Sequence, residues 1–162
     1  MPKSATPPQP SPATQGRGLS PPPLSLYVHL PWCVRKCPYC DFNSHEFKSP
    51  KGSGTLPFDA YVDALIADLD FDLPLVWGRT VQTVFFGGGT PSLFPPEAID
   101  RFLQLAASRL RFAPEVEITL ETNPGTVEHG PFAGYRVAGV NRLSFGVQSF
   151  DDGCLQRLGR MH

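Results

Sequence analysis

Hydrophobic and polar positions follow two different periods along the chain. Short, mostly hydrophobic runs predict strands at residues 25–30, 81–86, 116–121 and 142–145. Between them, hydrophobic residues such as Tyr61, Leu65 and Leu69 recur every four positions, which predicts one face of a helix. We expect helices at residues 58–71, 95–110 and 127–138, and a last helix that begins near residue 151.

This order of elements predicts an α/β fold. Strands that alternate with helices form a parallel sheet with the helices packed outside it. Ligands of such sheets bind at the carboxyl ends of the strands. We therefore expect any chemistry in the segments that directly follow the predicted strands.

The first 23 residues differ from the rest of the chain. They are rich in proline, serine and threonine and have few large hydrophobic side chains. We therefore predict a disordered tail at residues 1–23 and a folded core at residues 24–162. The tail lacks acidic residues, as organelle transit peptides do, but it has no amphipathic helical pattern, so a transit peptide is not favoured.

Three cysteines lie within eight residues, directly after the first predicted strand. They are Cys33, Cys37 and Cys40, with the spacing C-x3-C-x2-C. Thiolates bind zinc, copper(I) or iron–sulfur clusters. A 4Fe–4S cubane takes one ligand at each iron, so three cysteines leave one iron open to an added ligand. The spacing favours such a cluster.

Two other interpretations of the cysteines stay open at this point. A Cys3His zinc site could use His29 or His45, although a second pair of closely spaced ligands is missing. A disulfide framework is less favoured, because the chain has four cysteines and the fourth, Cys154, lies far away. We expect Cys154 to be a small hydrophobic side chain near a helix start, and His29 to be a strand histidine with satisfied hydrogen bonds.

Three glycines end the second predicted strand. Gly87, Gly88 and Gly89 are followed by Thr90. Glycines at a strand end let a ligand approach the backbone with no side chain in the way. A glycine triplet alone is often only a turn, but one strand–helix unit after a three-cysteine loop it indicates a ligand site.

Composition adds few limits. The chain has 162 residues, of which 41% are hydrophobic, and a net charge of −1. This length suffices for one core, and the near-neutral charge gives no reason to expect nucleic acid as a partner. No run of 18 apolar residues occurs, so no membrane span is expected. Isolated thiols indicate a reducing compartment, and we expect a cytoplasmic protein.

Four segments resemble a known family. They are LYVHLPWCVRKCPYCDFNSH (26–45), FFGGGTPS (85–92), ITLETNPGTVE (118–128) and AGVNRLSFGVQSFDDGCLQRLGRMH (138–162). They are similar to radical S-adenosylmethionine proteins, within these to the oxygen-independent coproporphyrinogen III oxidase family, and most closely to its heme-chaperone branch. The resemblance implies a partial (β/α)6 barrel with a parallel sheet. About four βα units are present, so we expect an N-terminal fragment.

The same resemblance implies roles for individual residues. Cys33, Cys37 and Cys40 would hold three irons of a 4Fe–4S cluster, and S-adenosylmethionine would bind the fourth iron. The residues expected to contact S-adenosylmethionine are Tyr27, Tyr39, Gly88, Gly89, Thr90, Glu121, Gln148 and Arg160. Four of these match positions that line a second cofactor site in the coproporphyrinogen oxidases, namely Gly89, Thr90, Gln148 and Arg160.

The implied chemistry is the reductive cleavage of S-adenosylmethionine to a 5′-deoxyadenosyl radical. In the coproporphyrinogen oxidases this radical takes hydrogen from propionate side chains, which then lose carbon dioxide. This chain departs from those enzymes at Phe42, where they carry a further cysteine. The sequence DFNSH at residues 41–45 is typical of the heme-chaperone branch. We therefore expect heme binding and transfer, with coproporphyrinogen III dehydrogenation and an inactive fragment as alternatives.

The resemblance also implies partners. These are heme as the cargo of the full-length protein, recipient hemoproteins, and an electron donor such as flavodoxin or ferredoxin. Through its recipients the protein could make peripheral contact with a membrane. The heme-contacting region of this branch is expected in the carboxyl half, beyond this chain.

Overall fold

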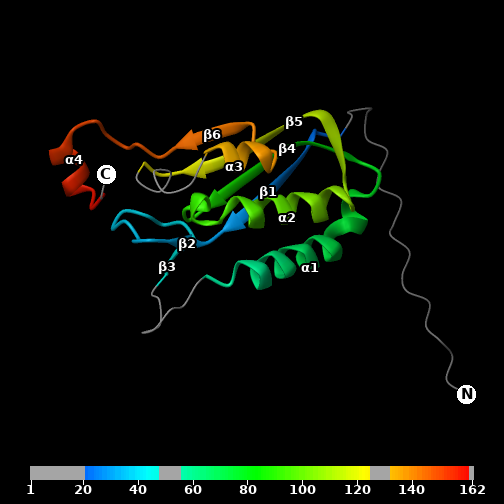
Figure 1. The fold of residues 1–162 in the computed structure, drawn as a ribbon, viewed down its shortest axis with the longest axis horizontal. Coiled ribbons are helices and arrows are strands. Elements are labelled where there is room, and N and C mark those ends of the chain that lie inside the picture. Colours follow the sequence, from blue (N-terminus) through cyan, green and yellow to red (C-terminus); the bar gives the residue numbers. More distant parts are fainter. Residues whose placement is uncertain (1–20, 48–55, 125–131, 161–162) are drawn as a thin grey trace, which may run out of the picture.

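The computed structural model describes residues 21–47, 56–124 and 132–160. The predicted tail at residues 1–23 therefore lies almost entirely outside the described residues. The strands and helices, shown in Figure 1, are β1 (Leu24–Leu30), β2 (Trp32–Cys33), β3 (His45–Glu46), α1 (Phe58–Val76), β4 (Thr80–Gly88), η1 (Pro91–Leu93), α2 (Pro96–Ala107), β5 (Arg111–Thr122), α3 (Phe132–Val137), β6 (Arg142–Phe145) and α4 (Asp152–Arg157).

Four strands form one parallel sheet in the order β1-β4-β5-β6. Leu30 pairs with Gly88 at one strand end, and Glu121 pairs with Ser144 at another. The short strands β2 and β3 form a separate parallel pair. The predicted α/β class with a parallel sheet is confirmed, and the strand ends that carry the motifs lie at one edge.

A single core joins the sheet to its helices. Val28, Val84 and Phe86 of the sheet pack in one cluster with Ile99 and Phe102 of α2. Phe86 is fully buried, and burial of such a side chain stabilises the fold by about 1.5–3 kcal/mol. Because α1, α2 and α3 all contribute to this cluster, the described helices of the core cover the same face of the sheet.

The opposite face of the sheet carries polar and aromatic side chains. Tyr27 of β1 stacks on Phe85 of β4, with ring centroids 6.3 Å apart. Nearer the strand starts, Thr83 Oγ1 donates a 2.8 Å hydrogen bond to Ser25 Oγ. This face would line the interior of a barrel, and it leads directly to the edge at which the motifs meet.

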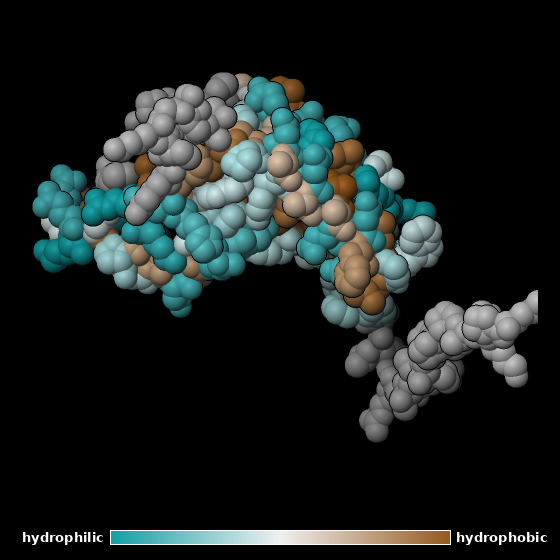
Figure 2. All heavy atoms as spheres, turned by 90° about the horizontal axis from the view of Figure 1, so that it is seen from below, coloured by the Kyte–Doolittle hydropathy of each residue, from teal (hydrophilic) through white to brown (hydrophobic). Residues whose placement is uncertain are grey.

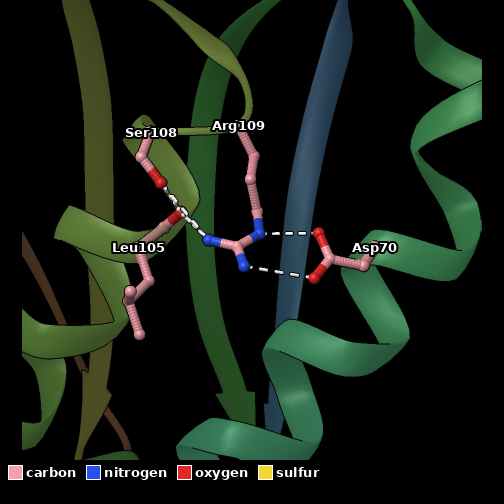
Figure 3. A network of polar contacts seen from close by, with 4 residues as sticks. All are labelled: Asp70, Leu105, Ser108 and Arg109. Carbon is pink, nitrogen blue, oxygen red and sulfur yellow. Dashed lines mark hydrogen bonds and ion pairs between the residues drawn. The ribbon is translucent and has the colours of Figure 1, made fainter.

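Helix α1 continues five residues past its predicted end at residue 71, through Pro74. Just before this extension, Asp70 makes a bidentate ion pair with Arg109, which follows α2 (Figure 3). The Nε of Arg109 lies 2.6 Å from Asp70 Oδ1 and its Nη2 lies 3.1 Å from Oδ2, while Nη1 donates to the Leu105 carbonyl. The hydrogen bond from Arg109 lowers the pKa of the Asp70 carboxyl.

The outer surface of α1 carries exposed hydrophobic side chains. These made the end of the helix harder to predict from the sequence. Phe71, Leu75 and Trp77 are about four-fifths exposed. Seen from the side of α1, the molecule has hydrophilic side chains interrupted by hydrophobic ones (Figure 2). Residues 71–77 therefore have no clear polar face, although the four-residue spacing continues to Leu73, which packs against the core.

Two more boundaries differ from the prediction by three residues or more, whereas β4 ends only two residues after its predicted end. Strand β5 begins at Arg111, five residues early, although it contains Pro114, which cannot donate a ladder hydrogen bond. The register between β4 and β5 shifts between Val81 and Thr83, and this irregularity accommodates the proline. Helix α2 ends at Ala107, three residues before its predicted end.

The last elements agree with the prediction where they are described. Strand β6 has its predicted bounds, and Asp151 is the N-cap of α4, accepting a hydrogen bond from the Cys154 amide at 2.7 Å. Helix α3 is described from Phe132 onward, so the first part of its predicted range lies outside the described residues. Gly139, with a φ of 107°, ends α3 as predicted.

Candidate functional site: a three-cysteine cleft at the strand ends

The cysteine loop is closed at its base by the β2–β3 pair. His45 N–H donates to the Pro31 carbonyl at 2.7 Å, and Phe47 N–H donates to the Cys33 carbonyl at 2.9 Å. A turn with a 3.0 Å hydrogen bond from Cys40 N–H to the Cys37 carbonyl lies inside the loop. The sequence did not predict β2 and β3, because two-residue strands carry no periodic pattern.

Lys36 and Ser44 support the loop from within. Lys36 Nζ donates to the carbonyl oxygens of Phe42 and Ser44, at 3.2 and 3.0 Å. Ser44 is 1% exposed, and its Oγ lies 3.6 Å from the Sγ of Cys40. The charged side chain of Lys36 thus stabilises the loop conformation, and the Ser44 hydroxyl group lies next to the Cys40 thiol.

The glycines at the end of β4 bring that strand against the loop. Gly89 N–H donates to the Leu30 carbonyl and Thr90 N–H donates to the Trp32 carbonyl, each at 2.8 Å. A Cβ at Gly89 would lie 2.6 Å from the carbonyl oxygen of Trp32. Gly88 has a φ of 114°, and a Cβ there would meet the ring of His29 at 2.6 Å. Both positions therefore require glycine.

A cleft of about 180 Å³ lies between the cysteine loop and the strand ends. Ten of the eleven residues predicted for the site line it: Cys33, Cys37, Tyr39, Cys40, Gly88, Gly89, Thr90, Glu121, Gln148 and Arg160. The eleventh, Tyr27, does not line it but lines an adjoining pocket with Gly88 and Glu121. Residues far apart in sequence thus converge on one cavity, as their places at strand ends predict. Their individual roles stay predictions.

Glu121 is the acidic group of this cleft. Burial raises the pKa of its carboxyl, and a hydrogen bond from the Gly88 backbone N–H partly offsets that rise. Burial also raises the pKa of the nearby Tyr27 hydroxyl, with a further contribution from the charge of Glu121. The carboxylate is thus held against the glycine segment, where it can accept hydrogen bonds from a cationic ligand.

Asn123 connects the other polar groups and was not predicted as a site residue. Its Nδ2 donates to Thr90 Oγ1 at 3.1 Å, and its Oδ1 accepts from Arg160 Nη2 at 3.1 Å. The space is tight, because a Cβ at Gly146 would lie 2.7 Å from Asn123 Oδ1. The only sequence signal was its place directly after Glu121 and Thr122 at a strand end.

His29 is a strand histidine whose ring makes two hydrogen bonds. Its Nδ1 lies 3.0 Å from the Tyr27 hydroxyl and its Nε2 lies 2.8 Å from the Asn43 carbonyl, so both ring nitrogens are engaged. The expectation of a satisfied strand histidine is confirmed. His45, the other candidate for zinc, is exposed, and its Nε2 lies 3.1 Å from Asn43 Oδ1.

The three cysteines of the cleft supply the thiol donors that an iron–sulfur cluster requires. Within the described residues, no group of three or more His, Cys, Asp or Glu side chains is close enough to bind one metal ion. A cubane instead bonds each thiolate to a different iron and so spreads its ligands around a larger volume. Cys33, Cys37 and Cys40 are all free thiols around one cleft. A three-cysteine cubane therefore fits these residues.

Cys154 lies apart from this group. It belongs to α4, is partly buried and is not one of the residues that line the cleft. Its Sγ lies 3.1 Å from Nη2 of Arg157. The expected place near a helix start is confirmed, with a polar neighbour that the sequence did not indicate.

Comparison with known proteins identifies the family. Residues 27–162 match the family model described as the Radical SAM superfamily. The chain belongs to the radical SAM superfamily. This family membership implies a 4Fe–4S cluster and S-adenosylmethionine as cofactors, which agrees with the fit of the thiols to the cleft.

Relatives of this radical SAM chain include heme chaperones. It is 55% identical over 141 residues to the heme chaperone HemW of Escherichia coli K12, covering 87% of this chain and 36% of that protein. It is 51% identical to HemW of Haemophilus influenzae, covering 87% of this chain and 37% of that protein. The chain therefore spans about a third of the length of the curated relatives it matches.

A mitochondrial protein and a solved structure are also similar. The chain is 41% identical to radical S-adenosyl methionine domain-containing protein 1, mitochondrial, of Bos taurus, covering 85% of this chain and 30% of that protein. The coproporphyrinogen III oxidase HemN of Escherichia coli superimposes with a TM-score of 0.70 at 32% identity, covering 86% of this chain and 31% of that structure. The sheet of this radical SAM chain is thus part of a barrel of that kind, which confirms the predicted partial barrel.

No helix of the described residues has the length and hydrophobicity needed to cross a membrane.

Proposed function

We propose that this chain forms the cluster- and cofactor-binding part of a heme chaperone, a protein that binds heme and transfers it to hemoproteins. The observation that carries the proposal is the cleft itself, which three free cysteines line together with Glu121 and Arg160. The 55% identity to a HemW protein supports the chaperone function. Since the chain spans about a third of such proteins, heme transfer is proposed for the whole protein.

Each side of the cleft has a proposed role. Cys33, Cys37 and Cys40 would hold three irons of a 4Fe–4S cluster, which would leave the fourth iron for S-adenosylmethionine. When bound, a reduced cluster supplies one electron to the sulfonium of that cofactor. The half-buried carboxylate of Glu121 accepts hydrogen bonds from the cofactor's amino group, beside the Gly88 backbone. Arg160 provides a cationic group that also lines the cleft, next to Cys37.

Coproporphyrinogen III dehydrogenation is the second candidate function, and the structural similarity to HemN favours it. Phe42 argues against it. Its side chain is 62% exposed and borders both the cleft and the adjoining pocket, at the position where those oxidases carry a further cysteine. The cleft thus has an aromatic side chain in place of a fourth nearby thiol.

The proposed partners follow from the chaperone function. They are heme, recipient hemoproteins and a reductant of the flavodoxin or ferredoxin class, with peripheral membrane contact only through the recipients. We place the protein in the cytoplasm. Four free cysteines support a reducing compartment, because oxidising compartments favour disulfides.

Anaerobic reconstitution with iron and sulfide tests the cofactor site. We expect about four irons per chain and an EPR spectrum of the reduced protein that changes when S-adenosylmethionine is added. Cys33→Ala, Cys37→Ala and Cys40→Ala should each lower the iron content, whereas Cys154→Ala should not. Equal iron loading of the triple cysteine variant and the wild type would contradict the proposed ligand set.

Two assays of the full-length protein distinguish the two candidate functions. A heme chaperone should bind hemin stoichiometrically, seen as a shifted heme absorption band, and should leave coproporphyrinogen III unchanged under anaerobic conditions. A dehydrogenase should release carbon dioxide from coproporphyrinogen III while it consumes S-adenosylmethionine. Turnover of this kind without hemin binding would replace the chaperone proposal with the second candidate.

A further inference from the structure

Arg160 connects the end of α4 to the cysteine loop. Its guanidinium Nη1 lies 3.5 Å from the Sγ of Cys37, a residue 123 positions earlier. The neighbouring Nη2 donates to Oδ1 of Asn123 and to the carbonyl oxygen of Gly146. The segments that follow β5 and β6 therefore fix one half of the guanidinium, and the other half is directed at the sulfur.

The backbone that carries Arg160 is fixed as well. Helix α4 ends in a Schellman motif, in which Gly159 N–H donates to the Gln156 carbonyl and Arg160 N–H donates to the Leu155 carbonyl. Gly159 has a φ of 69°, and a Cβ there would lie 3.0 Å from Cδ of Pro38. Glycine thus allows the helix end to lie directly against the loop, beside Cys37.

The positive charge of Arg160 lacks a carboxylate partner within the described residues, where the ion pairs are made by Arg101, Arg109 and Arg142. The Nε of Arg160 is also buried, with no hydrogen-bond partner in the described part of the chain. A guanidinium stays charged in proteins, and a partly desolvated charge is costly unless an opposite charge stands near it. Three thiolates and a cluster would supply that negative charge at this place.

We propose that Arg160 is a positioning residue for the cluster: it donates a charged N–H···S hydrogen bond to Cys37 and thereby raises the reduction potential of the cluster. The inference rests on the proposed function, because it requires a cluster bound to Cys37. Hydrogen bonds to ligand sulfurs tune cluster potentials, and a positive charge nearby favours the more negative, reduced state. This role differs from a contact to S-adenosylmethionine because it operates before that cofactor binds.

Helix α4 contains a matched control. Arg157 Nη2 lies 3.1 Å from the Sγ of Cys154, so the same pair of groups recurs in the same helix. Neither residue lines the cleft. Arg157→Gln therefore removes an equal charge and the same type of contact without touching the proposed cluster ligands.

The experiment is an EPR-monitored redox titration of the reconstituted 162-residue chain without S-adenosylmethionine, with the iron content measured for each variant. We expect Arg160→Gln to lower the equilibrium constant for one-electron reduction of the cluster about tenfold. This corresponds to a midpoint potential lower by about 59 mV. Arg160→Lys should cause a smaller decrease, because it keeps the charge but loses the planar fork that reaches three partners at once. Arg157→Gln should match the wild type.

An unchanged potential in fully loaded Arg160→Gln, or an equal decrease in Arg157→Gln, would overturn the proposal. If Arg160→Gln does not retain iron, Arg160→Lys decides: a lowered potential supports the proposal and a wild-type potential overturns it. A wild-type chain that binds no cluster is a different result, because it removes the proposed function itself. The wild-type iron content alone separates these two failures.

Discussion

At the residue scale, Glu121 combines a cost in stability with a proposed role in cofactor binding. Burial raises the pKa of its carboxyl, so the folded chain binds this proton more tightly than the unfolded chain does. Stability from this group is therefore fully present below the unfolded pKa and is lost as the pH rises through the folded pKa. Once ionised, the buried carboxylate therefore lowers the stability of the fold.

We therefore predict that Glu121→Gln stabilises the cofactor-free chain at pH 7 and abolishes the EPR response to S-adenosylmethionine. The amide oxygen can still accept the hydrogen bond from Gly88 N–H, while the buried charge is removed. Thermal unfolding at pH 7 and pH 4 measures the first effect, and the gain should shrink at pH 4, where the carboxyl is mostly protonated.

Glu117→Gln is the matched control for this substitution. Glu117 lies on the same strand, but its side chain is half exposed and lies 3.6 Å from Arg142. Its substitution should change the melting temperature little and leave the cofactor response intact. A Glu121→Gln chain that is less stable at pH 7 than the wild type would show that the carboxylate contributes net stability.

The residue scale also shows what the sequence could predict of the site. Cysteine spacing and strand-end glycines identified the cleft, because both patterns are local in sequence. Asn123 was missed because its importance comes from contacts with Thr90 and Arg160, which are distant in sequence. The contact of Arg160 with Cys37 was missed for the same reason, although Arg160 itself was predicted as a cofactor contact.

At the element scale, Tyr135 ties α3 to η1, the short turn that follows the glycine segment. Its hydroxyl group donates to the carbonyl oxygens of Ser92 and Phe94, at 2.9 and 2.8 Å. The side chain is 4% exposed, and burial raises the pKa of its hydroxyl to about 12. A helix on the outer face of the sheet thus supports the turn next to Thr90.

We predict that Tyr135→Phe lowers the free energy of unfolding by about 1–3 kcal/mol at pH 8, because two buried carbonyl groups lose their donor. The folded pKa lies above the unfolded value, so this stabilisation is complete below about pH 10 and is lost as the pH rises toward 12. The difference between the variant and the wild type should therefore shrink over that range. Urea unfolding at several pH values measures it.

Tyr61→Phe provides the comparison. The Tyr61 hydroxyl makes a single, partly buried hydrogen bond to the His29 carbonyl at 2.9 Å. Its loss should cost less, about 0.5–1.5 kcal/mol. If both variants lost the same free energy of unfolding, the hydrogen bonds of Tyr135 would contribute no more to stability than the single hydrogen bond of Tyr61.

Strand and helix identities were predictable from periodicity, and the exceptions have physical causes. Helix α1 continues through Pro74, and in its last turn Leu73 and Val76 pack against the core. Strand β5 starts early because an irregular register accommodates Pro114. Both causes lie in pairing between elements, which no local pattern encodes.

At the scale of the whole molecule, the cleft gathers segments from nearly the whole described chain. The loops after β1, β4, β5 and β6 and the residue that ends the described chain, Arg160, all line it. The order of elements predicted this convergence, because parallel strands bring their carboxyl ends to one edge. A ligand in the cleft would therefore add contacts between segments that the sheet and a few hydrogen bonds, such as Asn123 to Thr90, already join.

We accordingly predict that cofactor binding stabilises the whole fold and not the loop alone. A ligand that binds only the native state adds about 2.7 kcal/mol at a concentration of 100 Kd. The melting temperature of the cluster-loaded chain should rise with S-adenosylmethionine. Hydrogen exchange should slow at residues 33–47, 87–90, 121–123 and 146–160, and change little at the buried face of α2, which the core already protects.

A triple variant, with Cys33, Cys37 and Cys40 each changed to alanine, tests whether the stabilisation by S-adenosylmethionine depends on the cluster. Without the cluster, S-adenosylmethionine lacks the open iron, so the rise in melting temperature and the slowed exchange should both disappear. An equal rise in this variant would place S-adenosylmethionine at a site independent of the cysteines. Protection confined to residues 33–47 would instead show that the cluster orders its own loop without drawing the other strand ends together.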